Sequence, residues 1–290
     1  MMRNTWALGG GLLIVGSIAV CGQAFAQPFG LMFERDNDVA SNELGFNTYA
    51  TYADILTANA TSSTFSNINV NAPFSTTGIT WDGSQFIVMF ERDNDVTSNE
   101  LGFNTYATYA DILTANATSS TFSNINVNAP FSTTGITWDG SQFIVMFERD
   151  NDVTSNELGF NTYATYADIL TANATSSTFS NINVNAPFST TGITWDGSQF
   201  IVMFERDNDV TSNELGFNTY ATYADILTAN ATSSTFSNIN VNAPFSTTGI
   251  YFVGDDQGDQ QVPGPTPILL MSPVLAGLVF RRVRSQKGSG

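Results

Sequence analysis

The sequence predicts an all-β protein made of tandem repeats, and a four-bladed β-propeller is the architecture that it favours. Three observations carry this prediction. The sequence repeats with a period of 57 residues, in four copies that are almost identical from MFERDND to FSTTGI. Each copy contains short strand-like runs between turn signals, and the two ends of the chain complement each other. A fixed period of this size is typical of solenoids, propellers and tandem arrays.

The repeat is close to perfect. The segment MFERDNDV begins at Met32, Met89, Met146 and Met203, with a constant spacing of 57 residues. Between this segment and FSTTGI, the first copy has Ala40 where the other three have threonine. Such near-identity indicates recent duplication, so we expect every copy to fold alike and to present the same surface.

The first half of a blade is visible in residues 135–147. Residues 135–138 (GITW) alternate, which places Ile136 and Trp138 on one face of a strand. The Asp-Gly pair that follows predicts a tight hairpin turn, because glycine accepts positive φ. Residues 143–147 (FIVMF) form an unbroken apolar run, which suits a strand covered on both faces.

The remaining segments complete a four-stranded unit. Residues 102–116 are rich in Tyr, Thr and Phe and are interpreted as a strand, although YADIL at 109–113 is also compatible with a short helix. Residues 124–128 alternate asparagine with aliphatic residues, as an outer strand facing water does. Four strands with one covered on both faces describe a propeller blade, and GITWDGSQFIV resembles the inter-strand turn of many bacterial β-propellers.

The chain ends favour a closed ring. Residues 29–32 align with 86–89, but the GITWDG strand that should precede them is missing. At the other end, residues 249–254 (GIYFVG) supply one such strand. Pairing the two ends would close four blades and remove two exposed sheet edges. The alternatives are an open β-solenoid, which would need caps, and separate 57-residue domains, each with a marginal core.

Composition excludes several classes of function. The formal charge is −17, from 26 acidic and 9 basic residues, so the chain repels phosphate backbones and we expect no nucleic-acid partner. It has no histidine and a single cysteine, Cys21. These counts exclude a disulfide framework, Cys/His zinc sites and a Ser-His-Asp triad. No catalytic residue and no cofactor-binding residue is predicted.

The N-terminal 26 residues have the features of a secretory signal. A positive charge near the start, an apolar stretch over 6–20, and the small residues Ala24 and Ala26 of an A-x-A cleavage site follow in order. We therefore expect an exported chain that begins after Ala26. Two alternatives stay open: lipid attachment at Cys21, which the bulky Val20 disfavours, and an uncleaved membrane anchor.

The C-terminal tail changes composition abruptly after the repeats. An acidic linker leads to VPGPTPILLMSPVLAGLVFRRVR, in which a Pro-x-Pro motif, an apolar segment and an arginine cluster occur in order. The apolar part is near the lower length limit for spanning a bilayer, and the arginines would hold its far end in the cytoplasm. The motif residues are Pro263, Gly264, Pro265, Arg281, Arg282 and Arg284.

This tail resembles the PEP-CTERM sorting signal of Gram-negative bacteria, with Gly264 where that family most often has glutamate. The resemblance implies processing by an exosortase near the Pro-Gly-Pro motif, after transient anchoring in the inner membrane. It also implies release or display at the cell surface, in families linked with exopolysaccharide and biofilm. A plain single-pass anchor is the alternative. The expected segments are a signal peptide (1–26), a repeat domain (27–254) with units starting at 32, 89, 146 and 203, a linker (255–265) and an apolar, basic tail (266–290).

Each repeat also offers a candidate calcium site in ERDNDVTSNE, which reads ERDNDVASNE in the first copy. Its oxygen-bearing side chains are the ligands that Ca²⁺ prefers, although the spacing is not that of an EF-hand. A solvated acidic loop, with Asp and Asn making turns, is the alternative interpretation. The candidate ligands are Asp36, Asp38, Glu43, Asp93, Asp95, Glu100, Asp150, Asp152, Glu157, Asp207, Asp209 and Glu214.

Repetition itself favours binding over catalysis. Carboxylate catalysis needs two groups in different environments, whereas near-identical units present one environment several times. A repeated site suits multivalent contact with exopolysaccharide, cations or a second copy of the chain. We expect a non-enzymatic binding or structural role, and the alternative is an extracellular polysaccharide hydrolase acting through acidic residues. Trp138, Tyr106 and Tyr109 are interpreted as core residues, with a sugar-stacking platform as the alternative.

Overall fold

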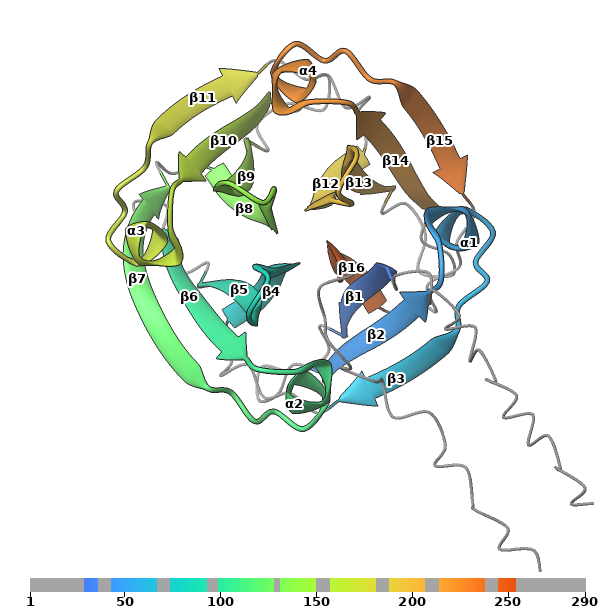
Figure 1. Ribbon diagram of the computed structural model, residues 1–290, viewed down its shortest axis with the longest axis horizontal. Helices are drawn as coiled ribbons and strands as arrows, with labels where there is room; N and C mark the ends of the chain where they lie inside the picture. The colour runs from blue at the N-terminus through green and yellow to red at the C-terminus, as the bar shows by residue number, and fades with distance from the viewer. Residues whose placement is uncertain are drawn as a thin grey trace, which may run out of the picture.

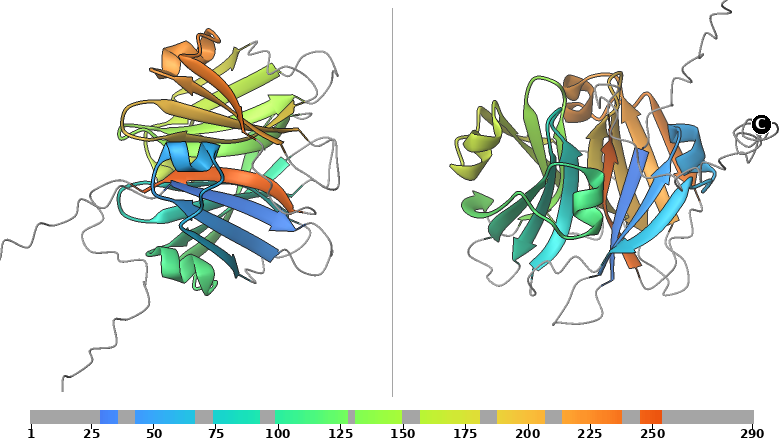
Figure 2. Two further views of the ribbon diagram at one scale, coloured as in Figure 1. Left: turned by 90° about the vertical axis from the view of Figure 1, so that its right-hand side faces the viewer. Right: turned by 60° about the horizontal axis from the view of Figure 1, so that its bottom comes forward.

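The computed structural model is a four-bladed β-propeller, so the predicted fold class is confirmed (Figure 1). Four antiparallel four-stranded sheets surround a central axis, and four short helices lie near the rim. Figure 2 shows that the helices gather at one end of the ring. The structure describes residues 29–35, 43–66, 74–92, 99–127, 131–149, 157–180, 188–206, 214–237 and 245–253.

The first blade joins both ends of the described chain. It contains β16 (Phe245–Phe252), β1 (Phe29–Arg35), β2 (Glu43–Tyr49) and β3 (Ser62–Ser66), from the axis outward, with α1 (Tyr52–Leu56) between β2 and β3.

The other three blades are each continuous in sequence. The second contains β4 (Phe74–Trp81), β5 (Phe86–Arg92), β6 (Asn99–Tyr106), α2 (Tyr109–Leu113) and β7 (Ser119–Val127). The third contains β8 (Phe131–Trp138), β9 (Phe143–Arg149), β10 (Glu157–Tyr163), α3 (Tyr166–Leu170) and β11 (Ser176–Ser180). The fourth contains β12 (Phe188–Trp195), β13 (Phe200–Arg206), β14 (Glu214–Tyr220), α4 (Tyr223–Leu227) and β15 (Ser233–Ser237).

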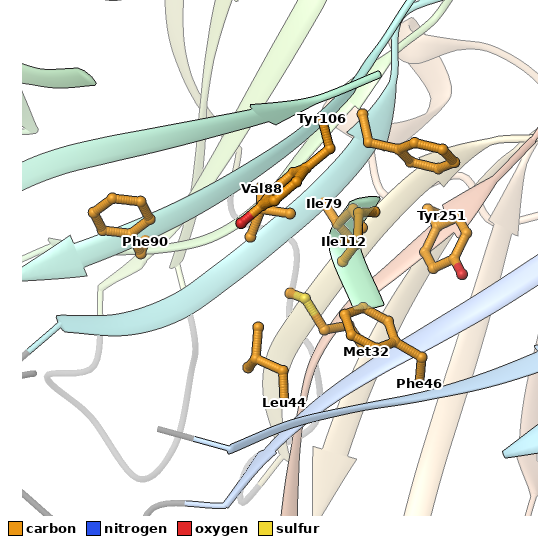
Figure 3. Packing of buried hydrophobic residues seen from close by; sticks show 10 residues of the cluster. Met32, Leu44, Phe46, Ile79, Val88, Phe90, Tyr106, Ile112 and Tyr251 are labelled. Carbon is orange, nitrogen blue, oxygen red and sulfur yellow. The ribbon is translucent and has the colours of Figure 1, made fainter. Parts of the chain in front are cut away.

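The apolar run of each unit is buried on both faces, as predicted. In β5, Phe86, Val88 and Phe90 pack toward the first blade, while Ile87 and Met89 pack toward the third. Figure 3 shows one of these inter-blade clusters. Alternation along a strand sends successive side chains to opposite faces, so a strand between two neighbouring blades is apolar throughout. The hydrophobic core of the ring is therefore four clusters, each shared by two adjacent blades.

Glycine lets the four innermost strands approach one another. A Cβ on Gly78 of β4 would lie 2.9 Å from the backbone nitrogen of Ile136 in β8. Gly135, Gly192 and Gly249 face the next innermost strand in the same way, with closest approaches of 3.0 Å. Cα atoms of the innermost strands of opposite blades also come within 8 Å. The axis is therefore narrow, and the side-chain-free position is what permits a ring of only four blades.

The predicted closure of the ring is confirmed. β1 pairs antiparallel with β16, with Phe29 opposite Phe252 and Arg35 opposite Phe245. The C-terminal strand thus occupies the innermost position of the first blade, beside β1, the first strand of the described residues. Figure 1 shows β16 beside β1, at the position that β4, β8 and β12 hold in the other blades.

Two details of the blade differ from the sequence-based interpretation. Residues 102–116 do not form one strand: β6 ends at Tyr106, and Tyr109–Leu113 is the helix α2. The hydroxyl of Thr108 accepts the backbone N–H of Asp111 and caps this helix, and Ile112 is its buried residue. The outermost strand begins earlier than predicted, since β7 runs over Ser119–Val127.

Other predicted segments lie outside the described residues. These are the signal peptide with Ala24 and Ala26, the linker, and the tail with its sorting-signal residues. In the described part of the chain, no helix is long and apolar enough to cross a bilayer.

Candidate functional site

The strand ends that flank the acidic segments lie at the end of the ring opposite the helices. In each blade the second and third strands pair so that an arginine lies opposite the glutamate that follows the acidic segment, as Arg92 lies opposite Glu100. The far ends of the same strands, Phe86 and Tyr106, lie beside the hairpin and the helix. The strand ends that flank all four acidic segments therefore share one end of the propeller.

The candidate calcium ligands are only partly placed by the structure. Glu43, Glu100, Glu157 and Glu214 occupy strand positions, and their side chains are not described. The eight aspartates lie outside the described residues: Asp36, Asp38, Asp93, Asp95, Asp150, Asp152, Asp207 and Asp209. Among the side chains that are described, no three His, Cys, Asp or Glu residues group as metal ligands do. Calcium binding stays a prediction.

Next to each acidic segment, a buried glutamate joins two blades. The Glu91 carboxylate of β5 accepts the backbone N–H of Thr133 in β8 at 2.6 Å, and also its hydroxyl. Both residues are 3% exposed. Burying a charge is costly unless it is hydrogen-bonded, so this contact stabilises the blade interface rather than leaving a reactive group. The same pair recurs as Glu34 with Thr76, Glu148 with Thr190, and Glu205 with Thr247.

A second threonine links the innermost strands around the axis. The Oγ1 atoms of Thr133 and Thr77 lie 3.2 Å apart across the second and third blades. Thr77 sits at a β-bulge, where the register of β4 against β5 shifts between Thr76 and Gly78. The equivalent contact closes the ring between Thr76 and Thr248, at 3.1 Å. Sequence reasoning missed both sets of contacts, although a glutamate and a threonine recur 42 residues apart in every repeat.

At the end of the ring where the helices lie, the aspartate of each hairpin turn accepts hydrogen bonds from the backbone of the same turn. Oδ1 of Asp139 accepts the backbone N–H of Ser141 at 2.8 Å and that of Gln142 at 2.9 Å. Gly140 has φ +92°, as the predicted tight turn requires. Asp82 and Asp196 make the same bonds in their blades. These carboxylates are thus occupied by turn formation.

The helix-capping aspartate has a similar local role. The carboxylate of Asp111 accepts the hydroxyl of Thr108 at 2.7 Å and the amide of Asn116 at 2.9 Å. These hydrogen bonds, the one from Thr108 above all, lower the pKa of the Asp111 carboxyl. The pKa values of Asp54, Asp168 and Asp225 are lowered by the same contacts in the other blades.

The aromatic residues considered for sugar stacking lie mostly in the core. Tyr106 is 1% exposed, and burial raises the pKa of its phenol. Trp138 is half-buried and packs on Phe143, with ring centroids 4.6 Å apart. Tyr109 is half-buried and contacts both Phe46 of the first blade and Phe86 of its own. The tyrosine at the start of each helix therefore fastens its blade to the preceding one.

Comparison with known proteins identifies no family for this chain. No family model matches the chain, and no curated protein matches it. Among solved structures, one match is a subtype N10 neuraminidase-like protein of A/little yellow-shouldered bat/Guatemala, with 11% sequence identity and a TM-score of 0.31. The match covers 71% of this chain and only 62% of that one. A likeness this low supports no conclusion about function.

The described structure defines the class: a closed four-bladed β-propeller of near-identical blades. Each blade carries the same buried glutamate and the same capped helix. A hairpin joins the two inner strands in three blades, and in the first blade these strands are β16 and β1. The described residues that differ in sequence from blade to blade all lie in the first, where β1 pairs with β16.

Proposed function

We propose that this chain is an exported, acidic repeat protein with a non-enzymatic binding or structural role at the cell surface or in the extracellular matrix. The supporting observation is how the described carboxylates are used. Each one makes a structural hydrogen bond that recurs in other blades. The glutamates join neighbouring blades, and the aspartates stabilise the hairpins or cap the helices. Fixed, repeated contacts of this kind favour a scaffold that displays the same loops several times.

The acidic segments are the proposed binding elements, and divalent cations or anionic glycans bridged by them are the proposed ligands. The strand ends that flank these four segments share one end of the ring, so weak single contacts would add up through multivalency. Oxygen-rich segments of this composition suit Ca²⁺. Binding to the folded form would raise the melting temperature by mass action.

Calcium titration of the full chain tests this part of the proposal. The melting temperature is measured with and without millimolar calcium, for the parent and for variants in which the two aspartates of one, two, three and then four segments become asparagine. A rise that shrinks in steps supports multivalent binding. The control matched to the one-segment variant is Asp82→Asn with Asp139→Asn, which also removes two carboxylates, here from hairpin turns at the opposite end of the ring. An equal rise in the parent and the four-segment variant would contradict calcium binding at these segments.

A hydrolase would behave differently in the same variants. Release of reducing sugar is measured on a panel of neutral and anionic polysaccharides. We expect none from the parent. Activity abolished by a change in a single segment would contradict the non-enzymatic proposal, because an enzyme depends on one or two particular carboxylates.

Export and surface display are proposed from the two ends of the chain. The proposed route is signal-peptide cleavage after Ala26, transient anchoring by the apolar tail, and exosortase processing near Pro263 and Pro265. Mass spectrometry of the secreted or surface protein from an exosortase-containing host would show both new termini. Replacing Arg281, Arg282 and Arg284 with serine should leave the tail uncut. An intact N-terminus would contradict export by this route, and an intact C-terminus would contradict the sorting signal.

A further inference from the structure

The strand pair that closes the ring differs from its counterparts at one matched position. In the second, third and fourth blades, a threonine of the innermost strand lies opposite an isoleucine, as Thr80 lies opposite Ile87. In the first blade the corresponding pair is Tyr251 opposite Gly30. Both residues of the pair have changed, one becoming larger and the other smaller.

The two changes compensate each other in space. A Cβ added to Gly30 would lie 2.0 Å from Cζ of Tyr251, so the tyrosine ring occupies the space where the isoleucine of the other blades would begin. Tyr251 is 1% exposed and reaches into the cluster between the first and second blades (Figure 3). There its ring meets Phe86 edge-on, with centroids 5.8 Å apart, and lies 6.3 Å from Tyr109.

Most of the remaining residues of the two pairing strands are the same in every blade, so they do not distinguish the correct strand pair from a wrong one. The first six residues of β16, 245–250, are identical to those of β4, β8 and β12. The last four residues of β1, 32–35, are identical to their counterparts in β5, β9 and β13. Strand register is specified only where side chains discriminate, and repeated sequences invite pairing one whole blade out of place.

We propose that the steric complementarity of Gly30 and Tyr251 specifies which two strands close the ring. Opposite Ile87, Ile144 or Ile201, the Tyr251 ring would overlap the isoleucine side chain, so β16 is excluded from the inner position of the other blades. Opposite Gly30, the threonine of β4, β8 or β12 would leave a void of about one aromatic ring, so those strands pair poorly with β1. The clash and the void destabilise the wrong closures, as unfavourable contacts with wrong partners do at other specific interfaces.

The test compares Gly30→Ile, Tyr251→Thr and the double variant in the full chain. Gly30→Ile should lower the melting temperature of the parent because it overlaps the tyrosine ring. In the Tyr251→Thr background the same change should raise it, because the double variant rebuilds the Thr–Ile pair of the other blades. A reversal of sign is the signature of direct coupling. The same sign in both backgrounds, or no effect of either single change, would overturn the proposal.

Loss of register discrimination is the second readout. After dilution from denaturant, the monomer fraction is measured by size-exclusion chromatography with light scattering. The double variant should give at least twofold less monomer than the parent, since its β1 now accepts any innermost strand. Ile112→Val is the control, because it weakens the core without touching a strand pair. Parental monomer yield in the double variant would overturn the register role, and so would an equal loss in Ile112→Val. Tyr251→Phe keeps the ring and should match the parent in both readouts.

Discussion

The Glu91 carboxylate in the second blade accepts both the backbone N–H and the hydroxyl of Thr133 in the third, and both residues are buried. The pair recurs at every blade interface, including the one that β16 completes through Glu205 and Thr247. Neighbouring blades of this small ring are therefore joined by hydrogen bonds to a charged group as well as by apolar packing.

Removing the hydroxyl from this contact should weaken the ring. Thr133→Val keeps the shape of the side chain and the backbone N–H but deletes the second donor to Glu91. We expect a loss of about 1–3 kcal/mol in the free energy of unfolding, the usual cost of a lost hydrogen bond to a buried charged group. Denaturant titration measures it. Ser132→Ala, at the exposed neighbouring position, is the control. Equal stability of Thr133→Val and Ser132→Ala would show that the contact contributes nothing.

A methyl group at the axis should also destabilise the fold. Gly78→Ala would place its Cβ 2.9 Å from the backbone nitrogen of Ile136, and backbone cannot move aside as a flexible side chain can. We expect a cost of about 1–3 kcal/mol from overpacking, measured by chemical denaturation. Ser75→Ala, exposed on the same strand, should be close to neutral. A stabilised Gly78→Ala variant would mean that the axis is wider than the structure has it.

Alkaline pH should unfold the ring through its tyrosines. Burial raises the pKa of Tyr106 and raises that of Tyr251 well above its ordinary value. Folding thus favours the neutral phenol, so this stabilisation is complete below the ordinary pKa of about 10 and is lost as pH rises above it. Phenolate absorbance and circular dichroism should change together in an alkaline titration. Tyr251→Phe should shift the transition to higher pH. Phenolate formation well before unfolding would contradict burial of these rings.

Acid should loosen the helix caps. Hydrogen bonds to the folded-state carboxylate lower the pKa of Asp111, so its contribution is present above the ordinary pKa of about 4 and is lost as pH falls through the lowered value. Hydrogen exchange of the Tyr109–Leu113 amides should accelerate below that pH. In Asp111→Asn the same amides should exchange independently of this titration, once the intrinsic pH dependence is removed. Acceleration of equal size in both proteins would contradict the assignment.

Much of the architecture was predictable because it depends on local pattern and repetition. The 57-residue period, the apolar run at 143–147 and the hairpin at Asp139-Gly140 each correspond to a feature of the blade. The complementary chain ends predicted the pairing of β1 with β16. The helix over Tyr109–Leu113 was left open, since five residues with one buried isoleucine carry too short a pattern to separate helix from strand.

What only the tertiary structure decided concerns contacts between blades. The sequence by itself determined that four equal β units exist and that the chain ends complete one another, because strand alternation and turn chemistry are properties of neighbouring residues. It did not determine that Glu91 meets Thr133 or that Gly78 faces the next inner strand. Those relationships join residues 42 or more positions apart in sequence, and they arise only when the sheets close around an axis. The contact between Tyr251 and Gly30 is of the same kind, because it forms only when β1 and β16 pair.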